Sequence, residues 1–305
     1  MNSEKVAVVL DPHIDDRTPD KWAVDYFEES LNQLKIVSEN YKNVLIPGDL
    51  LERPVLEKSC YNRLFDFFLQ RKSAGNVFKA VPGNHDVFNN NTDTLERTDL
   101  YSFCLSRVLD IWEESFELCG VFFDVIPFGA NPRVPKNERG RDVLIGHFYM
   151  DFEFDEKYSV KQEDVAKSEY PLVILGHDHE PYRDVNVGKS VVVRHGSVSR
   201  RSAYPYNLER VPQILEVWKD GESVESKKVT LEGFKKPSEI YREKAFRSDD
   251  ERQSSKDDER PLSDLLSMFE GTSQETLQVE SVMCSVGAEQ KHLDYLEQCN
   301  SKIKQ

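Results

Sequence analysis

The order of segments along the chain predicts an α/β fold. Short β-branched apolar runs, which are typical of buried strands, lie at 5–10, 43–47 and 76–82. Each run ends in a polar turn, and the first two turns lead into segments with helical apolar spacing at 22–37 and 59–72. Strands that alternate with helices in this way indicate an α/β domain.

Local signals justify the elements of the first half. The strand KVAVVL ends at Asp11-Pro12-His13, which places polar, ligand-type side chains at its carboxyl end. The first helix follows the start signal Thr18-Pro19-Asp20. The second helix carries Leu64 and Phe68 on one face, and the strand NVLIP delivers the dipeptide Gly48-Asp49.

The second half of the chain contains two similar stretches. DVLIGH at 142–147 and LVILGH at 172–177 are each a strand-like apolar run that ends in Gly-His. Their likeness places two histidines at equivalent strand ends. The other expected elements are a helix around 100–109 and strands at 121–128, 190–195 and 213–218.

Length and composition limit the classes of protein. A chain of 305 residues can bury one full-sized α/β core with room for a small appendage. No apolar run approaches the ~18 residues of a membrane span, and the first residues lack a signal-peptide pattern. We therefore expect no membrane partner and a cytoplasmic location, or the cytosol of an infected host if the protein is viral. The five scattered cysteines, without Cys-x-x-Cys spacing, predict neither disulfides nor a thiolate zinc site.

The net charge excludes a protein that simply coats DNA. A formal charge of −15 opposes nonspecific binding to phosphates, so basic loops, divalent cations or a partner must supply any positive field. The loop at 131–141 carries Arg133, Lys136, Arg139 and Arg141. A solvated loop is the favoured interpretation of these charges, and a substrate rim is the alternative.

The composition changes near residue 247. The segment 247–260 (RSDDERQSSKDDER) has no large apolar residue, which predicts a disordered charged linker after a domain at 1–246. Beyond it, 261–269 has the pattern of a short amphipathic helix and 291–303 that of another. We expect this C-terminal helical tail, 261–305, either to dock on its own domain or to bind a partner groove.

The segment Gly83-Asn84-His85-Asp86 directly follows the third apolar run. Asn84 can offer its side-chain carbonyl to a metal ion, and His85 can donate a proton nearby. Taken alone, the segment could also be an ordinary tight turn, because glycine and asparagine both tolerate positive φ.

Other histidines strengthen the chemical interpretation. Five of the seven, namely His13, His85, His147, His177 and His179, follow strand-like runs. In open α/β sheets, ligands bind beyond the carboxyl ends of the strands. The residues expected to meet there are Asp11, His13, Asp49, Asn84, His147, His177 and His179. Mixed oxygen and imidazole ligands suit manganese, iron or zinc, and seven ligands exceed the need of one ion, so we expect two ions with one bridging carboxylate.

The motifs as a set resemble the calcineurin-like metallophosphoesterases, over roughly residues 5–220. They are Asp11-x-His13, Gly48-Asp49, Gly83-Asn84-His85-Asp86, Gly146-His147 and Gly176-His177-Asp178-His179. The resemblance implies two facing mixed β-sheets flanked by helices, the four-layer sandwich of that family, followed here by the tail. It also implies two divalent ions, with Mn²⁺ favoured and iron, zinc or magnesium as the alternatives.

The resemblance also implies a division of roles. One ion would be held by Asp11, His13 and His179, and the other by Asn84, His147 and His177. Asp49 would bridge them, and His85 would stay off the metals and protonate the leaving oxygen. The alternative for His85 is that it only shapes its loop.

Within the family, the chain is most similar to the SbcD-type DNA exonuclease subunits, in a compact, phage-like form. The strand at 190–195 is followed by Gly196-Ser197-x-x-Arg200, which resembles their Gly-Ser-x-x-Arg segment. The resemblance implies a Mn²⁺-dependent nuclease that acts on DNA ends with an SMC-like ABC ATPase bound through the tail, and it leaves homodimer formation open. The candidate substrate contacts are His195, Ser197, Arg200 and Arg53.

Other functions of the same fold stay open. Glu52-Arg53-Pro54 resembles the Asp-Arg-Gly of protein serine/threonine phosphatases, although those lack the Gly-His-x-His ending found here. A phosphatase and an RNA or cyclic-nucleotide phosphodiesterase are therefore alternatives. A scaffold without catalysis is a weaker one, because no ligand position is degraded.

Overall fold

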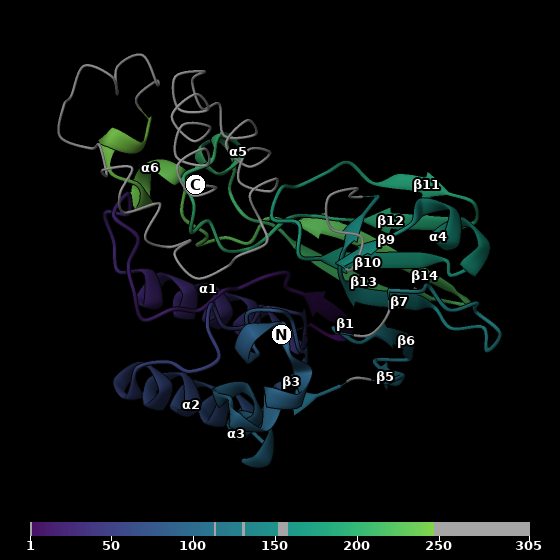
Figure 1. Cartoon of the computed structure of the whole chain (residues 1–305), viewed down its shortest axis with the longest axis horizontal. Helices are drawn as coiled ribbons and strands as arrows, with labels where there is room; N and C mark the ends of the chain where they lie inside the picture. Colours follow the sequence, from purple (N-terminus) through teal and green to yellow (C-terminus); the bar gives the residue numbers. More distant parts are fainter. Residues whose placement is uncertain (1, 113, 130–131, 152–157, 247–305) are drawn as a thin grey trace, which may run out of the picture. The chain divides into compact units, whose positions relative to one another are not determined.

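A computed structural model describes residues 2–112, 114–129, 132–151 and 158–246 of the chain. Within these residues, two six-stranded sheets face each other, as Figure 1 shows. The first sheet has the order β14 (Ser223–Val229), β13 (Ile214–Asp220), β1 (Asn2–Val8), β2 (Tyr41–Pro47), β3 (Val77–Val81) and β4 (Asp110–Ile111). The second has the order β11 (Val185–Val187), β12 (Ser190–Val193), β10 (Leu172–Gly176), β7 (Val143–His147), β6 (Val121–Ile126) and β5 (Phe116–Leu118).

Both sheets are mixed. In the first, β1, β2, β3 and β4 run parallel, β13 pairs antiparallel with β1, and β14 pairs antiparallel with β13. In the second, β12, β10, β7 and β6 run parallel between the antiparallel edge strands β11 and β5. A small parallel pair, β8 (Tyr149–Met150) and β9 (Ser159–Val160), lies outside the two sheets. The predicted fold class, two facing mixed sheets flanked by helices, is confirmed.

Alternating side chains divide the core into layers. Val8 and Leu10 join Ile145 and Ile174 in a cluster between the two sheets. Ala7 packs in a different cluster, with residues of the helices α1 (Tyr26–Asn40), α2 (Lys58–Ser73) and α3 (Asp99–Leu105). Outer-face residues of β7 and β10 pack with Val165 of α4 (Gln162–Ser168). The order is therefore helices, sheet, sheet, helix (Figure 1).

Some boundaries differ from the prediction. The first helix begins at Tyr26, because the Asp25 carboxylate caps it by accepting from Glu28 N at 2.9 Å. Trp22 lies outside the helix and packs with Tyr241. In the sequence, Tyr241 lies between the short helix α6 (Pro237–Ile240) and the 3₁₀ turn Glu243–Phe246. The third helix ends at Leu105 instead of 109. The edge strand β14 was not predicted, because its polar, alternating sequence has no buried run.

The basic loop lies away from the edge where the motifs meet. Its described part, 132–141, leads into the amino end of β7. There Arg141 pairs with Asp124 at 3.5 Å and lies over the ring of Phe122. This position favours the interpretation of a solvated loop over that of a substrate rim.

The predicted linker, 247–260, and the tail, 261–305, lie outside the described residues. Among the helices that are described, none is long and apolar enough to span a bilayer.

Candidate metal centre

The motif residues meet at one edge shared by both sheets. Asp11 and His13 follow β1, Asp49 follows β2, and the turn with Asn84 follows β3. From the second sheet, His147 ends β7, and the segment with His177 and His179 follows β10. Because β1, β2 and β3 are parallel, and β7 and β10 are parallel, each sheet presents its carboxyl ends together.

The loops that carry these side chains have unusual backbone conformations. Asp11, His13, Asp49 and His177 all have positive φ, at 48°, 46°, 49° and 81°. This region costs non-glycine residues on the order of 1–3 kcal/mol each, and persists only where the surrounding structure imposes it. Residues held in this way at one edge indicate a functional site.

Glycines allow the close approach of neighbouring loops. A Cβ atom on Gly48, whose φ is +100°, would lie 1.9 Å from His147 Nδ1. One on Gly83 would lie 2.2 Å from Asp49 Oδ1. The glycines of Gly48-Asp49 and Gly83-Asn84 are therefore required so that ligands from neighbouring strands can meet.

Asp86 fixes the turn of the third motif. Its two carboxylate oxygens accept from the main-chain N–H groups of Leu51 and Gly83, both at 2.9 Å. The main-chain N–H of His85 in turn donates to Asp49 Oδ1 at 2.9 Å. The turn is thus tied to the Asp49 loop, and its conformation holds Asn84 and His85 at the site.

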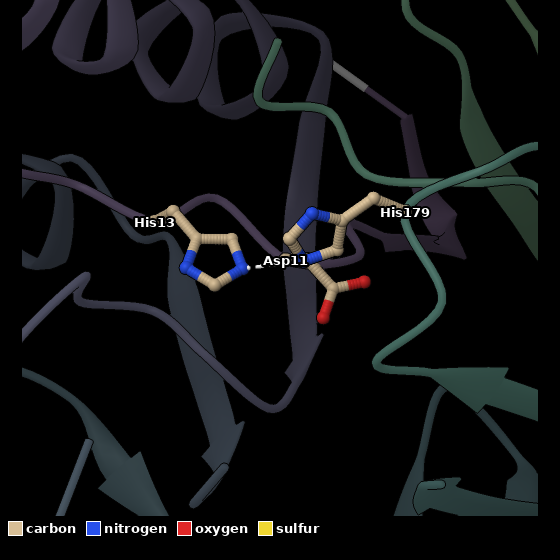
Figure 2. Close-up of side chains that lie close together, drawn as sticks. All are labelled: Asp11, His13 and His179. Atoms are coloured by element: carbon tan, nitrogen blue, oxygen red, sulfur yellow. Dashed lines mark hydrogen bonds between the residues drawn. The ribbon is translucent and has the colours of Figure 1, made fainter. Parts of the chain in front are cut away.

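A first group of candidate ligands contains Asp11, His13 and His179 (Figure 2). The Nε2 atoms of His13 and His179 lie 2.8 Å apart, and the ligand atoms of all three residues lie within 4.8 Å of one another. Asp11 Oδ1 accepts from the main-chain N–H of His177, whereas Asp11 Oδ2 is buried and has no hydrogen-bond partner in the described structure. A buried, unpartnered carboxylate oxygen beside two imidazole nitrogens fits a bound cation.

A second group surrounds His147. Its Nε2 lies 3.0 Å from Asp49 Oδ2, 3.0 Å from Asn84 Oδ1 and 3.1 Å from His177 Nδ1. Asp49 Oδ2 is also 3.5 Å from His13 Nε2, in the first group. Asp49 is therefore placed between the groups, as a bridging carboxylate would be.

The electrostatics of the site favour cation binding. Burial lowers the pKa of His177 to about 3 and that of His179 to about 2, so both imidazoles are neutral near pH 7 and keep a free lone pair. Burial alone would also lower the pKa of His147, but the carboxylates of Asp49 and Asp11 raise it to about 9. Burial opposes ionisation of Asp49, yet His147 and His13 hold its pKa well below the usual range. A metal bound here would displace the proton of His147 and take its place as the counter-charge.

His85 is placed differently from Asp11, His13, Asp49 and His147, which are buried. Its side chain is 37% exposed, and its Nδ1 lies 2.9 Å from the carbonyl oxygen of Glu52, so that Nδ1–H donates and Nε2 is left free. The ring packs edge-on against His13, with centroids 4.8 Å apart. His85 is also close enough to His13 and Asp49 to form a third possible ligand group. The hydrogen bond to Glu52 fits either role, because a metal-bound imidazole would also donate its other N–H to a carbonyl oxygen, so the role of proton donor stays a prediction.

A model of the family described as calcineurin-like phosphoesterase matches residues 4–261. The chain belongs to this family. Members are metal-dependent hydrolases that typically bind two divalent metal ions, and the two ligand groups around Asp49 agree with that pattern. The oxygen and imidazole donors fit hard or borderline divalent ions.

Solved structures also resemble this phosphoesterase. One is the crystal structure of TT1561 of Thermus thermophilus, with 12% identity, a TM-score of 0.43, and coverage of 74% of this chain and 99% of that one. Another is a hypothetical protein from the same organism, with 12% identity, a TM-score of 0.40 and the same coverage. No curated protein matches the chain.

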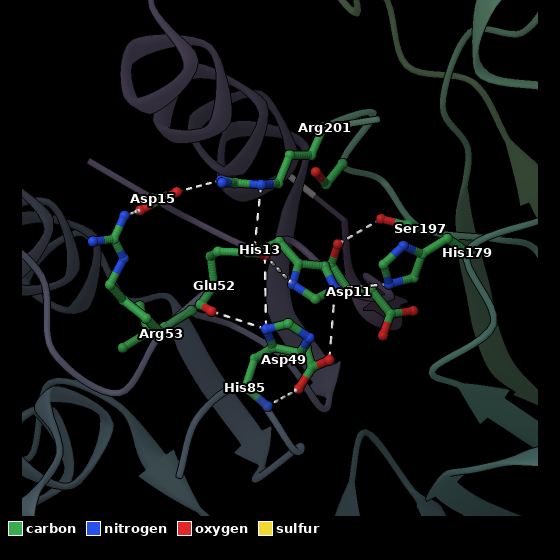
Figure 3. A network of polar contacts seen from close by, with 12 residues as sticks. Asp11, His13, Asp15, Asp49, Glu52, Arg53, His85, His179, Ser197 and Arg201 are labelled. Atoms are coloured by element: carbon green, nitrogen blue, oxygen red, sulfur yellow. Dashed lines mark hydrogen bonds and ion pairs between the residues drawn. The ribbon is translucent and has the colours of Figure 1, made fainter. Parts of the chain in front are cut away.

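The phosphoesterase site includes a polar network that the sequence did not predict (Figure 3). Glu52 Oε2 lies 2.9 Å from His13 Nδ1, and Glu52 Oε1 lies 3.2 Å from Arg201 Nε. The buried carboxylate of Asp15 pairs with both Arg53 and Arg201, and Figure 3 shows it between their guanidinium groups. A usable signal was present, because Asp15 and Glu52 each follow a ligand motif within three residues. Glu52 orients the ring of His13, and Asp15 holds the guanidinium groups of Arg53 and Arg201 at the rim of the site.

The candidate substrate contacts fall into two groups. The side chain of Arg53 is 25% exposed at the rim, where it could reach a ligand. Ser197 is buried, and its hydroxyl donates to the carbonyl oxygen of Asp11 at 2.6 Å. Arg200 is buried and donates to the carbonyl oxygens of Arg210 at 3.0 Å and Lys235 at 2.7 Å. This geometry favours a role in bracing the fold for Ser197 and Arg200 over contact with substrate.

His195, the remaining candidate, is buried, and neither ring nitrogen has a hydrogen-bond partner in the part of the chain that is described. Burial, together with the positive charges of Lys228 and Arg210, lowers its pKa to about 3. This environment keeps the imidazole neutral and offers no path to a substrate, which favours a structural role.

We expect His195 to make folding stability depend on pH. In the folded chain its pKa, about 3, lies below the ordinary value of 6.5. At a pH between these two values, the unfolded chain therefore binds a proton that the folded chain does not. Stability should therefore fall as pH drops below about 6.5, by ~1.4 kcal/mol per pH unit from this group. Urea unfolding between about pH 7 and pH 4.5 should show a shallower dependence for His195→Gln than for the wild type. Equal slopes would contradict this assignment.

Proposed function

We propose that the protein is a phosphodiesterase that hydrolyses DNA ends with two divalent ions, Mn²⁺ in the first place. The main support for phosphoester hydrolysis is the position of Asp49, whose Oδ2 faces His13 on one side and His147 on the other. Two ions that share a carboxylate activate water and neutralise the phosphate in an in-line displacement.

The choice of DNA is supported by the segment after β12. Gly196-Ser197-x-x-Arg200 resembles the corresponding segment of SbcD-type exonuclease subunits. Ser197 braces the Asp11 loop through its hydrogen bond to Asp11 O. Arg201, which directly follows Arg200, has a side chain that is 31% exposed at the rim of the site. Because Asp15, Asp16 and Glu52 pair with Arg53 and Arg201, the positive field for a phosphate backbone in this chain of charge −15 would come mainly from the two bound ions.

The chain's own residues account for the departure of the leaving group. The Glu52 carbonyl accepts from His85 Nδ1–H, which fixes the tautomer in which Nε2 must gain a proton before it can act as an acid. The protonated ring then donates from Nε2 to the leaving oxygen as its bond to phosphorus breaks. The attacking water oxygen forms the new bond to phosphorus, and the products are a phosphomonoester and an alcohol.

The test is a panel of substrates with added manganese: linear DNA, circular DNA, RNA, a cyclic nucleotide and a phosphopeptide. We expect linear DNA to be degraded at least about ten times faster than the other substrates. Useful rates only on phosphopeptides or small monoesters would replace the nuclease proposal by the phosphatase alternative, which Arg53 after Glu52 favours. No hydrolysis at all, with metal bound, would favour a scaffold. The ATPase partner and the tail at 261–305 stay predictions from the sequence.

A further inference from the structure

Part of the cavity over the metal centre is aromatic. The cavity has a volume of about 250 Å³ and is lined by His85, His177 and His179 together with Tyr149, Tyr204 and Tyr206. On one side, the ring of Tyr149 packs against His177, with centroids 4.2 Å apart. The proposed mechanism uses none of the three tyrosines, so their position next to the reacting groups needs another explanation.

Tyr204 is the most accessible of the three to a ligand. Its side chain is 57% exposed, and its ring stacks on that of Tyr206, with centroids 5.7 Å apart and planes 24° apart. A large ring left in solvent contributes little to folding. The pair therefore offers a flat, open face beside the site.

The loop that carries the pair is braced. Pro205 opens the short helix α5 (Pro205–Glu209), and the Asn207 side chain donates to Ser202 O at 2.9 Å. Arg210 donates to Ser197 O at 2.7 Å, and Ser197 donates to Asp11 O. These hydrogen bonds connect the aromatic pair to the loop that carries the candidate metal ligand Asp11.

The surroundings distinguish between ligands. Asp178 also lines the cavity and would repel a second phosphate there. A nucleobase is neutral, flat and polarisable, and stacking on an aromatic side chain suits any of the bases. A base inside a duplex has both faces covered by its neighbours, whereas an unpaired base has free faces that can stack on this platform.

We propose that Tyr204, supported by Tyr206, stacks on an unpaired nucleobase next to the phosphodiester that is cleaved, and that it selects frayed or single-stranded ends. This inference rests on the proposed function, because the site must first accept a nucleic acid.

The test is a double-mutant cycle on the full chain with manganese. Short single-stranded oligonucleotides carry either a normal base or an abasic residue on each side of the cleaved bond, and kcat/KM is measured for each. We expect the wild type and Tyr204→Phe to prefer the base by roughly 5- to 100-fold, and Tyr204→Ala to lose that preference. Leu105→Ala, which removes an exposed apolar side chain on α3, is the matched control and should behave as the wild type. Wild-type discrimination by Tyr204→Ala, or an equal loss on both substrates, would overturn the inference.

A binding measurement separates this inference from the proposed function. A phosphorothioate oligonucleotide with 2-aminopurine at its end, mixed with protein and Ca²⁺, should show fluorescence quenching with the wild type and Tyr204→Phe, and much less with Tyr204→Ala. If no nucleic acid is cleaved but this pattern holds, the nuclease proposal fails and the stacking platform stands. If DNA is cleaved and quenching is the same in all variants, the nuclease stands and the platform is wrong.

Discussion

The variant Asp49→Asn should lose metal and activity together. Asparagine has nearly the shape of aspartate, but it removes the negative charge that lies between His13 Nε2 and His147 Nε2, at 3.5 Å and 3.0 Å. It also offers a single carbonyl oxygen where two cations would share a carboxylate. We expect the metal content to fall from two ions per chain to one or none, and activity at fixed metal concentration to fall on the order of 10³-fold or more.

Metal analysis after gel filtration and calorimetric titration with Mn²⁺ measure this directly. Asp66→Asn, which makes the same chemical change on the exposed face of α2, is the matched control and should keep both ions. If Asp49→Asn retained two ions with wild-type affinity, Asp49 would not be the bridging ligand.

The variant His85→Asn should separate metal binding from turnover. His85 belongs to neither of the two ligand groups that the resemblance implies, so both ions should remain bound. Loss of a general acid typically costs about 10²- to 10⁴-fold in rate. The loss should be large for DNA, whose leaving alcohol needs a proton, and much smaller for a p-nitrophenyl diester, whose leaving group does not.

The same variant tests the alternative that His85 only shapes its loop. The hydrogen bond from the residue 85 main-chain N–H to Asp49 Oδ1 survives the substitution, so thermal stability should stay near that of the wild type. A variant that loses its metal, or that slows both substrates equally, would show that His85 is a ligand or a structural residue.

The strand ends of the site could be predicted because their signals are local. A buried apolar run followed directly by a polar ligand-type pair is visible in ten residues, and parallel strands bring such ends together. The similar runs DVLIGH and LVILGH became β7 and β10, which are adjacent and paired in register from Val143↔Leu172 to His147↔Gly176. The candidate ligands therefore converge as expected, whereas their roles rest on the resemblance and on the variants above.

The partners of these residues could not be predicted, because they come from distant parts of the chain. Asp15 meets Arg201 across 186 positions, and no local pattern marks this pair. A charged residue such as Arg200 is expected at the surface, yet the structure buries it against two main-chain carbonyls. Composition also cannot distinguish a buried, unpartnered imidazole such as that of His195 from a reactive one.

Each ligand group draws on both sheets. In the first, Asp11 and His13 come from one sheet and His179 from the other; in the second, Asp49 comes from one and His147 from the other. A bound cation would therefore cross-link the two sheets at this edge, beyond the apolar cluster that packs between them. An ion present at 100 times its dissociation constant would add ~2.7 kcal/mol to the free energy of unfolding of the domain. The residues that would support phosphoester cleavage would then also help to hold the two sheets together.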